Sequence, residues 1–321
     1  MGILKMANIA FLYAGQGSQI TGMGKDLYET FPEFKAVFDN ASLEFDLKEM
    51  CFSNPENRLN ETHYTQPCMV AFGCGVTDVL KNRGVKPDFV CGLSLGEYSA
   101  LYAAGVWNLE ETMRIISFRG KVMAEASVGI DSAMAAIIGL EPEAVEQSCK
   151  QAASIGIVSI CNLNCPRQIV IGGEKEAVNS AMSFAKASGA KRCLSLPVSG
   201  PFHTSFMRPA AKALESMFKK VRFNEPSASV LYNVLGGSNI QSEPIANLLV
   251  RQVMSPVKMQ MCIEALFGAG IDTFIEIGPG TALSGFVKRT AKQLGVEPER
   301  YRLFSINTAS DIEALLSVLA S

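Results

Sequence analysis

Ser94 is the residue of this chain that its neighbours best equip to act as a nucleophile. It lies in Gly92-Leu93-Ser94-Leu95-Gly96, between an apolar stretch at 88–91 and a run of small residues at 97–104 that is typical of a helix. Glycines on both sides let a strand turn sharply into a helix, because a Cβ there would clash with neighbouring backbone. The pattern predicts a nucleophile elbow, with the first amides of the helix aimed at the serine.

A serine hydroxyl needs a base to accept its proton, and histidine is the usual one because imidazole titrates near neutral pH. The chain has two histidines. His63 lies in a polar stretch that leads into an expected helix, where a surface or capping role is the simpler interpretation. His203 lies after Pro201-Phe202, at a junction between two expected domains, where clefts commonly form. We therefore predict that His203 is the base, against the alternative of a structural histidine.

The sequence leaves open which group orients this imidazole. No aspartate stands out, and a main-chain carbonyl or a side-chain amide would serve as well as a carboxylate. The oxyanion that forms on an attacked carbonyl also needs two preorganised donors. One should be the amide of Leu95, directly after the serine. The other is expected in the loop Gly15-Gln16-Gly17, for which an ordinary turn is the alternative; no Gly-Lys-Ser/Thr follows, so it is not a P-loop.

Arg119 is the candidate for binding a charged substrate. It lies in an otherwise apolar helical stretch, residues 115–120. A guanidinium that points inward from such a helix requires a partner, and it could hold a substrate carboxylate through two parallel hydrogen bonds. The alternative is a surface arginine whose aliphatic stem covers apolar neighbours.

The nine cysteines are scattered through apolar stretches, which is typical of reduced, buried thiols rather than of a disulfide framework. Cys161 and Cys165 have a spacing that metal ligands can have, but no second pair and no nearby histidine accompany them. We expect two thiols of the core here, no metal site and no cofactor.

Composition narrows the class of protein. The 321 residues are 48% hydrophobic and 19% charged, which favours a soluble globular α/β protein, and a formal charge of -2 gives no reason to expect a nucleic-acid partner. No apolar stretch approaches the roughly 18 residues of a membrane span, and residues 1–7 do not form a signal peptide. We expect a cytoplasmic protein with no membrane partner.

The order of the expected elements indicates two domains. Strands at 8–13, 88–91, 229–233 and 273–277 alternate with helices, among them 24–38, 70–83, 206–218 and 245–253, which predicts a parallel sheet covered on both faces. Residues 133–196 instead show the order β-α-β-β-α-β of a ferredoxin-like unit. We expect a discontinuous large α/β domain, residues 1–128 and 200–321, that carries a small α+β subdomain at 129–199.

Together these motifs resemble those of the malonyl-CoA:acyl carrier protein transacylases of fatty-acid synthesis and the related acyltransferase domains of polyketide synthases. The resemblance runs nearly end to end. It rests on Gly15-Gln16-Gly17-Ser18-Gln19, Thr65-Gln66-Pro67, residues 92–100, Arg119-Gly120, Cys161-Asn162-Leu163-Asn164, Pro201-Phe202-His203, Gln252 and Glu276-Ile277-Gly278-Pro279-Gly280. It implies a hydrolase-like α/β domain with a ferredoxin-like insert, the arrangement already expected from the strand order.

The resemblance also implies roles. Ser94 is similar to the acyl-carrying nucleophile, His203 to its base and Arg119 to the clamp for the malonyl carboxylate. The main-chain carbonyl of Gln252 matches the group that holds the histidine, which would answer the question of the missing aspartate. The further residues that it implies at the site are Gln16 and Leu95, whose amides form the oxyanion hole, and Leu93 and Asn162 in substrate binding.

One position departs from the family pattern. The family often has a histidine directly before the nucleophile, where this chain has Leu93. The chemistry should remain intact, but the acyl selectivity is not fixed by the resemblance. Ala14 replaces a common proline before the glycine-rich loop, which we expect to matter little.

The expected reaction is transfer of a malonyl group from malonyl-CoA to the phosphopantetheine thiol of holo-acyl carrier protein through a malonyl-serine ester, with ping-pong kinetics, to supply fatty-acid synthesis. A serine hydrolase of acyl thioesters, a trans-acting acyltransferase of a polyketide pathway and a non-catalytic carrier-binding protein are the alternatives. We expect a monomer whose basic clusters, residues 191–192, 219–222 and 288–289, are candidates for docking the acidic carrier.

Overall fold

The structure is a computed structural model, and it describes residues 8–197 and 200–319. The expectation about residues 1–7 and the exact return from the small domain at 198–199 lie outside the described residues. None of the described helices is long and apolar enough to cross a membrane.

The larger sheet has six strands in the order β10-β9-β1-β2-β7-β8. The central strand β1 (Ile9–Tyr13) runs parallel to β9 (Thr273–Ile277) and β2 (Phe89–Gly92), and β10 (Arg302–Ile306) and β7 (Ser229–Tyr232) extend the parallel sheet on either side. The two-residue edge strand β8 (Gly237–Ser238) is antiparallel. The four strands predicted for this domain are confirmed, whereas β10 and β8 were not predicted.

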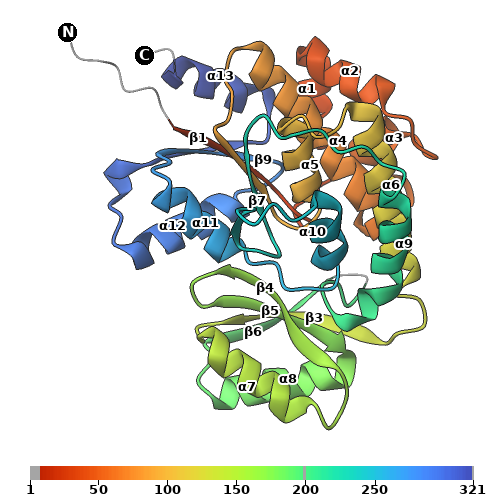
Figure 1. Ribbon diagram of the computed structural model, residues 1–321, viewed down its shortest axis with the longest axis vertical. Coiled ribbons are helices and arrows are strands. Elements are labelled where there is room, and N and C mark those ends of the chain that lie inside the picture. The colour runs from red at the N-terminus through yellow and green to blue at the C-terminus, as the bar shows by residue number, and fades with distance from the viewer. Residues whose placement is uncertain (1–7, 198–199, 320–321) are drawn as a thin grey trace.

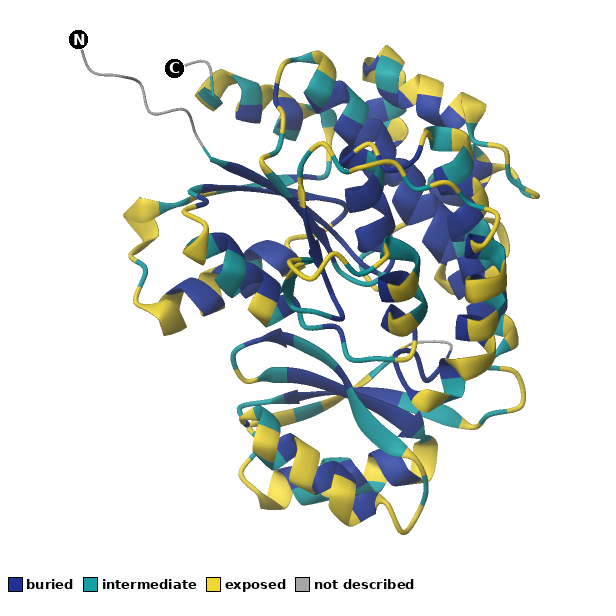
Figure 2. Ribbon diagram, in the orientation of Figure 1, coloured by how far each residue is buried: buried dark blue, intermediate teal, exposed yellow. Residues whose placement is uncertain are grey.

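Helices cover both faces of this sheet, and side chains of β1 alternate between two cores. Phe11 and Tyr13 belong to one core with α4 (Thr62–Asn82), α5 (Gly96–Ala103) and α6 (Leu109–Glu125), while Ala10 and Leu12 belong to the other with α11 (Met259–Gly268) and α12 (Ala282–Leu294). This is the period of two expected for a strand buried on both faces. Figure 2 shows the central strands β1 and β9 and the inner sides of these helices as buried.

The other helices of the large domain lie mostly around the first core (Figure 1). They are α1 (Lys25–Thr30), α2 (Pro32–Asn40), α3 (Leu47–Phe52), η1 (Pro55–Asn60), η2 (Ser205–Met207), α9 (Arg208–Phe218), α10 (Ile245–Gln252), η3 (Pro298–Arg300) and α13 (Ala309–Leu319).

Two helix predictions were wrong in their bounds. The helix expected at 24–38 is divided into α1 and α2, because Pro32 follows Phe31 and the residue before a proline is driven to the extended conformation that Phe31 adopts, with φ -115° and ψ 117°. The helix expected at 70–83 begins at Thr62, so Thr65-Gln66-Pro67 lies inside α4 rather than before it.

The smaller sheet has four strands in the order β4-β5-β3-β6, all antiparallel to their neighbours. Its elements follow one another as β3 (Ser132–Ile138), α7 (Pro142–Ala152), β4 (Val158–Cys165), β5 (Gln168–Glu174), α8 (Lys175–Ala187) and β6 (Arg192–Leu196). The predicted β-α-β-β-α-β order of the ferredoxin-like insert is confirmed, while the residue numbers at which we divide the domains stay a prediction. In Figure 1 this sheet lies between α7 and α8 on one side and the large domain on the other.

Strand β4 ties the small domain to the large one. The main-chain N–H of Leu163 donates to the carbonyl of Val257 at 2.8 Å, and the N–H of Val257 donates to the carbonyl of Cys161 at 2.8 Å. Val257 lies in the segment after α10, so the small sheet is fixed directly beside the C-terminal end of that helix.

Candidate active site

The turn at Ser94 is an elbow between the end of β2 and the start of α5, and its serine has a φ of 55°. A Cβ on Gly92 would lie 2.0 Å from the carbonyl carbon of Gly96, and one on Gly96 would lie 2.4 Å from the carbonyl oxygen of Tyr13. Both neighbours are backbone and cannot move aside. The predicted reason for the two glycines is therefore confirmed, and the serine is forced into a conformation that L-residues rarely adopt.

His203 lies against Ser94, as predicted. The Ser94 Oγ is 2.7 Å from Nε2 of the imidazole, and Nδ1 is 2.8 Å from the main-chain carbonyl oxygen of Gln252. A carbonyl oxygen only accepts, so Nδ1 carries the proton and Nε2 is free to accept the serine proton. The carbonyl of Gln252 therefore occupies the position of the missing third carboxylate.

The imidazole is prepared to act as a base. His203 is 4% exposed, and burial together with the nearby Arg119 cation lowers its pKa to about 4. The ring is consequently neutral at pH 7, the form that accepts a proton.

Arg119 points inward from α6 and is 1% exposed, so the alternative of a surface arginine is wrong. Its Nη1 donates to Gln66 Oε1 at 2.5 Å, and its Nη2 donates to Gln252 Oε1 at 2.9 Å and to Ser94 Oγ at 3.2 Å. The guanidinium carbon also lies 5.2 Å from the ring centroid of Tyr98. In the described part of the chain its hydrogen-bond partners are all uncharged, and its Nε has none. A buried cation of this kind is suited to an anionic ligand.

The glycine-rich loop lies against the elbow. The N–H of Leu93 donates to the carbonyl of Tyr13 at 2.9 Å, and a Cβ on Gly15 would lie 2.7 Å from the carbonyl oxygen of Leu93. The main-chain amides of Gln16 and Leu95 have no acceptor within residues 8–197 and 200–319. The two predicted oxyanion donors therefore come from adjacent segments, although their role stays a prediction.

A hydrogen-bonded chain links the loop to the arginine. The Gln16 side-chain oxygen accepts from the Thr62 hydroxyl at 2.8 Å, and Gln66 Nε2 lies 2.9 Å from the same hydroxyl. The oxygen of Gln66 then accepts from Arg119. Because Thr62 and Gln66 are one turn apart, the early start of α4 is what places this chain.

Asn233 is a site residue that sequence reasoning missed. It is fully buried at the end of β7, where its Oδ1 accepts from the Ser94 N–H at 2.8 Å and its Nδ2 donates to the Gly92 carbonyl at 2.7 Å. Its own N–H donates to Glu97 Oε2 at 2.6 Å. The available signal was a polar residue at the carboxyl end of an apolar strand, the edge at which ligands bind in parallel sheets.

The remaining predicted site residues lie near these groups. Leu93 is partly buried and packs against the core that contains α11 and α12. Asn162 is half-buried in β4 and forms an isolated bridge with Val257, five positions after Gln252. Substrate contacts for both stay predictions.

His63 is not brought into this cluster. It lies in the first turn of α4 with its Nε2 3.6 Å from Glu61 Oε2 and its ring centroid 4.0 Å from that of Tyr64. Its side chain is 36% exposed and lines a surface groove with Phe118 and Lys121. The surface interpretation of His63 is confirmed.

No metal centre is found among the described residues, which contain no group of three or more His, Cys, Asp or Glu side chains that could hold an ion. All nine cysteines are free, and Cys161 and Cys165 are buried. Cys161 Sγ contacts the carbonyl of Ser159, whereas Cys165 Sγ contacts the guanidinium of Arg289.

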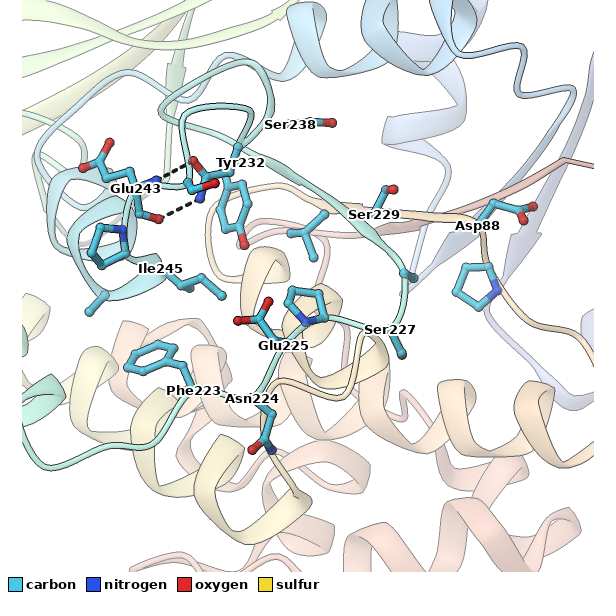
Figure 3. Close-up of a pocket in the computed structure, with 18 residues that line it drawn as sticks. Asp88, Phe223, Asn224, Glu225, Ser227, Ser229, Tyr232, Ser238, Glu243 and Ile245 are labelled. Carbon is cyan, nitrogen blue, oxygen red and sulfur yellow. Dashed lines mark hydrogen bonds between the residues drawn. The ribbon is translucent and has the colours of Figure 1, made fainter.

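A separate groove of about 820 Å³ is lined in part by residues of β7 and is shown in Figure 3. It is lined by residues 223–230, by Tyr232 and by residues 242–246, with Glu225 and Glu243 among its carboxylates. Ser94, His203 and Arg119 are not among its lining residues, so this groove is distinct from the site built around the elbow.

Comparisons with known proteins show the family of this chain. The family model described as the acyl transferase domain matches residues 10–314. The malonyl CoA-acyl carrier protein transacylase of Bacillus subtilis is 41% identical over 292 residues, which cover 90% of this chain and 92% of the relative. The enzyme of the same name from Escherichia coli K12 is 40% identical, over 90% of this chain and 94% of the relative.

Solved structures of related proteins have the same overall fold. The malonyl CoA-acyl carrier protein transacylase of Clostridium perfringens superposes with a TM-score of 0.91 at 41% identity, over 98% of both chains. The structure of a type II polyketide-synthase acyl-carrier protein in complex with its malonyl-transacylase contains a chain that superposes with a TM-score of 0.91 at 38% identity. The match covers 97% of this chain and 100% of that chain.

Proposed function

This chain belongs to the acyl transferase family, within the malonyl CoA-acyl carrier protein transacylases, and from that premise we propose the roles of its residues. The enzyme transfers a malonyl group from malonyl-CoA to acyl carrier protein and so serves fatty-acid synthesis. The following paragraphs assign each step to a side chain of the site.

Acylation begins with malonyl-CoA bound so that its free carboxylate faces Arg119. His203 Nε2 accepts the proton of the Ser94 hydroxyl, and the serine oxygen forms a bond to the thioester carbonyl carbon. The carbonyl oxygen becomes an oxyanion that accepts hydrogen bonds from the amides of Gln16 and Leu95. When the carbon–sulfur bond breaks, the coenzyme A sulfur takes the proton from the imidazolium, and a malonyl-serine ester remains.

Transfer is the same chemistry in reverse with a different thiol. The phosphopantetheine thiol of the carrier gives its proton to His203 and its sulfur attacks the ester carbonyl. Ser94 leaves and recovers a proton from the imidazolium. Because a thioester is consumed and a thioester is formed, the exchange is nearly balanced in energy, and the enzyme's harder task is to keep water away from the ester.

Arg119 carries the proposal. A guanidinium 1% exposed and 3.2 Å from the nucleophile gives a dicarboxylic acyl group a partner that the apolar pocket of an ordinary esterase would lack. The proposed steps need no cofactor, since serine, imidazole and guanidinium supply the nucleophile, the base and the cation. Gln252 acts as a positioning residue through its carbonyl, and we place Leu93 and Asn162 along the bound acyl chain.

The partners follow from the reaction. The protein meets malonyl-CoA and holo-acyl carrier protein, and it needs neither nucleic acid nor a membrane; we propose that it works as a monomer in the cytoplasm. The basic residues proposed for carrier docking are all exposed, and they are Lys191, Arg192, Lys219, Lys220, Arg222, Lys288 and Arg289. An acidic carrier is attracted by exposed positive charge of this kind.

Mass spectrometry of the intact protein tests the proposal. Brief exposure to malonyl-CoA should add one malonyl group to the wild type and none to Ser94→Ala, and later addition of holo-carrier should remove it onto the carrier thiol. Absence of any adduct would refute the transfer mechanism. Rapid loss of the adduct to water, with no carrier present, would identify a hydrolase instead.

A further inference from the structure

Glu97 has no part in the steps above, yet it lies one turn after the nucleophile on α5 and is fully buried. Its Oε2 accepts from the main-chain N–H of Asn233 at 2.6 Å, and its Oε1 has no hydrogen-bond partner in the described part of the chain. Burial of a carboxyl group costs free energy unless hydrogen bonds or an opposite charge compensate it, and an apolar side chain would avoid that cost. The position of Glu97 therefore calls for an explanation.

The elbow needs external support because Ser94 has a φ of 55°, and such a conformation persists only when surrounding groups hold it. Two side chains from outside the elbow bind its backbone. Asn233 accepts from the Ser94 N–H and donates to the Gly92 carbonyl, and Gln252 Nε2 donates to the Ser94 carbonyl at 2.9 Å.

Glu97 binds one of these supports directly, because its Oε2 accepts from the main-chain N–H of Asn233. The Gln252 side-chain amide, which donates to the Ser94 carbonyl, is a nearby polar group that lowers the pKa of Glu97. Gln252 also accepts from the Arg119 guanidinium and, through its carbonyl, holds the imidazole of His203. The Glu97 carboxylate is thus hydrogen-bonded to Asn233, the residue at the end of β7 that supports the backbone of Ser94.

The electrostatic surroundings of this carboxylate come from four elements. Burial raises the pKa of Glu97 to about 7, and the Asn233 N–H, the Gln252 amide and the Arg119 cation oppose that rise. The phenol groups that face it are those of Tyr98 on α5 and Tyr232 on β7. The negative charge of Glu97 therefore interacts with one cation, Arg119, among groups that are otherwise neutral.

We propose that Glu97 is a positioning residue of acyl transfer, which fixes Asn233 and through it holds the backbone of Ser94 in its reacting geometry. The inference rests on the proposed function of Ser94 and His203, and deepens it. Removal of the carboxylate should slow the reaction of the serine itself, and it should do so with little change in substrate affinity.

The test compares Glu97→Ala and Glu97→Gln with a matched control, Glu276→Gln. Glu276 is 1% exposed and lies near the end of β9. Its two oxygens accept from the N–H groups of Leu283 and Ser284, which are not part of the elbow. Three quantities are measured: the rate at which a fluorophosphonate labels Ser94, kcat and KM for malonyl-CoA, and the midpoint of thermal unfolding. The fluorophosphonate requires no malonyl group, so it reports on the serine alone.

Glu97→Ala should slow both the labelling rate and kcat by about 100-fold, with KM within about threefold, because loss of an outer residue that orients a reacting one costs about 10- to 100-fold. Glu97→Gln keeps an acceptor oxygen for the Asn233 N–H but loses the negative charge, so it should recover to about 10-fold below wild type. Glu276→Gln should lower the unfolding midpoint and leave both rates within about twofold at a temperature at which the protein is folded.

Wild-type labelling rates in the Glu97 variants, or equal slowing in Glu276→Gln, would overturn the inference. If Glu97→Ala does not fold, Glu97→Gln alone decides. A labelling rate of Glu97→Gln within twofold of wild type would then contradict the inference. The two proposals fail separately. A wild type that is labelled by fluorophosphonate but not by malonyl-CoA refutes malonyl transfer only, whereas malonyl transfer that is unaffected in both Glu97 variants refutes the role of Glu97 only.

Discussion

The guanidinium of Arg119 donates a hydrogen bond to the hydroxyl of Ser94 across 3.2 Å, so a permanent cation and a nucleophile share one buried site. The cation has two effects. It contributes to the lowered pKa of His203, which keeps the imidazole neutral, and we propose that it also binds the substrate carboxylate. The proposed preference for a dicarboxylic acyl group and the neutral state of the imidazole would thus derive from the same residue.

Arg119→Ala should therefore change the acyl preference. We expect kcat/KM for malonyl-CoA to fall about 100- to 1000-fold, because truncation of one partner of a buried, hydrogen-bonded charge pair costs about 2–5 kcal/mol. Acetyl-CoA, which lacks the carboxylate, should react as well as before or better. The measurement is a competition between the two thioesters, read as malonyl- and acetyl-serine in the intact mass.

Arg114→Ala is the matched control for that competition. Arg114 lies on the same helix, pairs with Glu111 at 2.6 Å and has a side chain that is 49% exposed. Its removal should leave the ratio of malonyl to acetyl adduct unchanged. A malonyl preference that survives in Arg119→Ala would show that another group binds the carboxylate.

The pH dependence of acylation should reflect the lowered pKa of His203. The imidazole stays unprotonated until the pH approaches 4, so titration of His203 should leave kcat/KM unchanged as the pH falls from 8 to about 5, whereas an ordinary imidazole would halve the rate near pH 6.5. The pre-steady-state rate of malonyl-serine formation measures this. Because Glu97 has a pKa of about 7, the profile is repeated in Glu97→Gln, and a step near pH 6.5 in both proteins would contradict the prediction.

The free energy of unfolding should also depend on pH through His203. The folded-state pKa of His203 lies below the value of about 6.5 in an unfolded chain, so the unfolded state binds more protons between those two values. The contribution of His203 to the free energy of unfolding is therefore complete above pH 6.5 and is lost as the pH falls toward 4. Urea unfolding should show that His203→Gln weakens this loss, and identical pH dependence in variant and wild type would refute it.

The glycines of the elbow should tolerate no side chain. Gly92→Ala places a Cβ 2.0 Å from a backbone carbon, which the structure relieves only by moving the elbow, so we expect a loss of about 3 kcal/mol in the free energy of unfolding. The control is Gly285→Ala inside α12, where no atom lies within 4 Å of the added Cβ. That variant should gain about 0.5–1 kcal/mol. Equal urea midpoints for the two variants would contradict the steric argument.

The sequence identified the groups that lie together at the proposed site because their chemistry is visible in residue type. Ser94 has glycines around it, His203 was one of two possible bases, and Arg119 is a charge in an apolar helix. Gln252 was found by resemblance alone, since it acts through a main-chain carbonyl and every residue has one. No argument from side-chain chemistry could have selected it.

Asn233 and Glu97 could not be assigned for a different reason. Asn233 is 139 positions from Ser94 and 136 from Glu97, and the three meet only because β7 lies beside β2 in the sheet. Strand order is a property of the assembled sheet. The missed strand β10 shows the same limit, because Arg302 and Ser305 interrupt its apolar run and its place at the edge of the sheet permits them.

The cysteines should be nearly inert in the folded enzyme. Eight of the nine are buried and Cys193 is half-buried, and burial raises the pKa of Cys149 to about 11 and that of Cys161 further still. Because the thiolate is the reacting form, a disulfide reagent such as dithiobis(nitrobenzoate) should modify at most Cys193 within minutes, and the rest only in denaturant. Activity should survive this treatment, since the proposed nucleophile is Ser94. Fast reaction of two or more thiols, or loss of activity in step with one of them, would show that a cysteine takes part in the site.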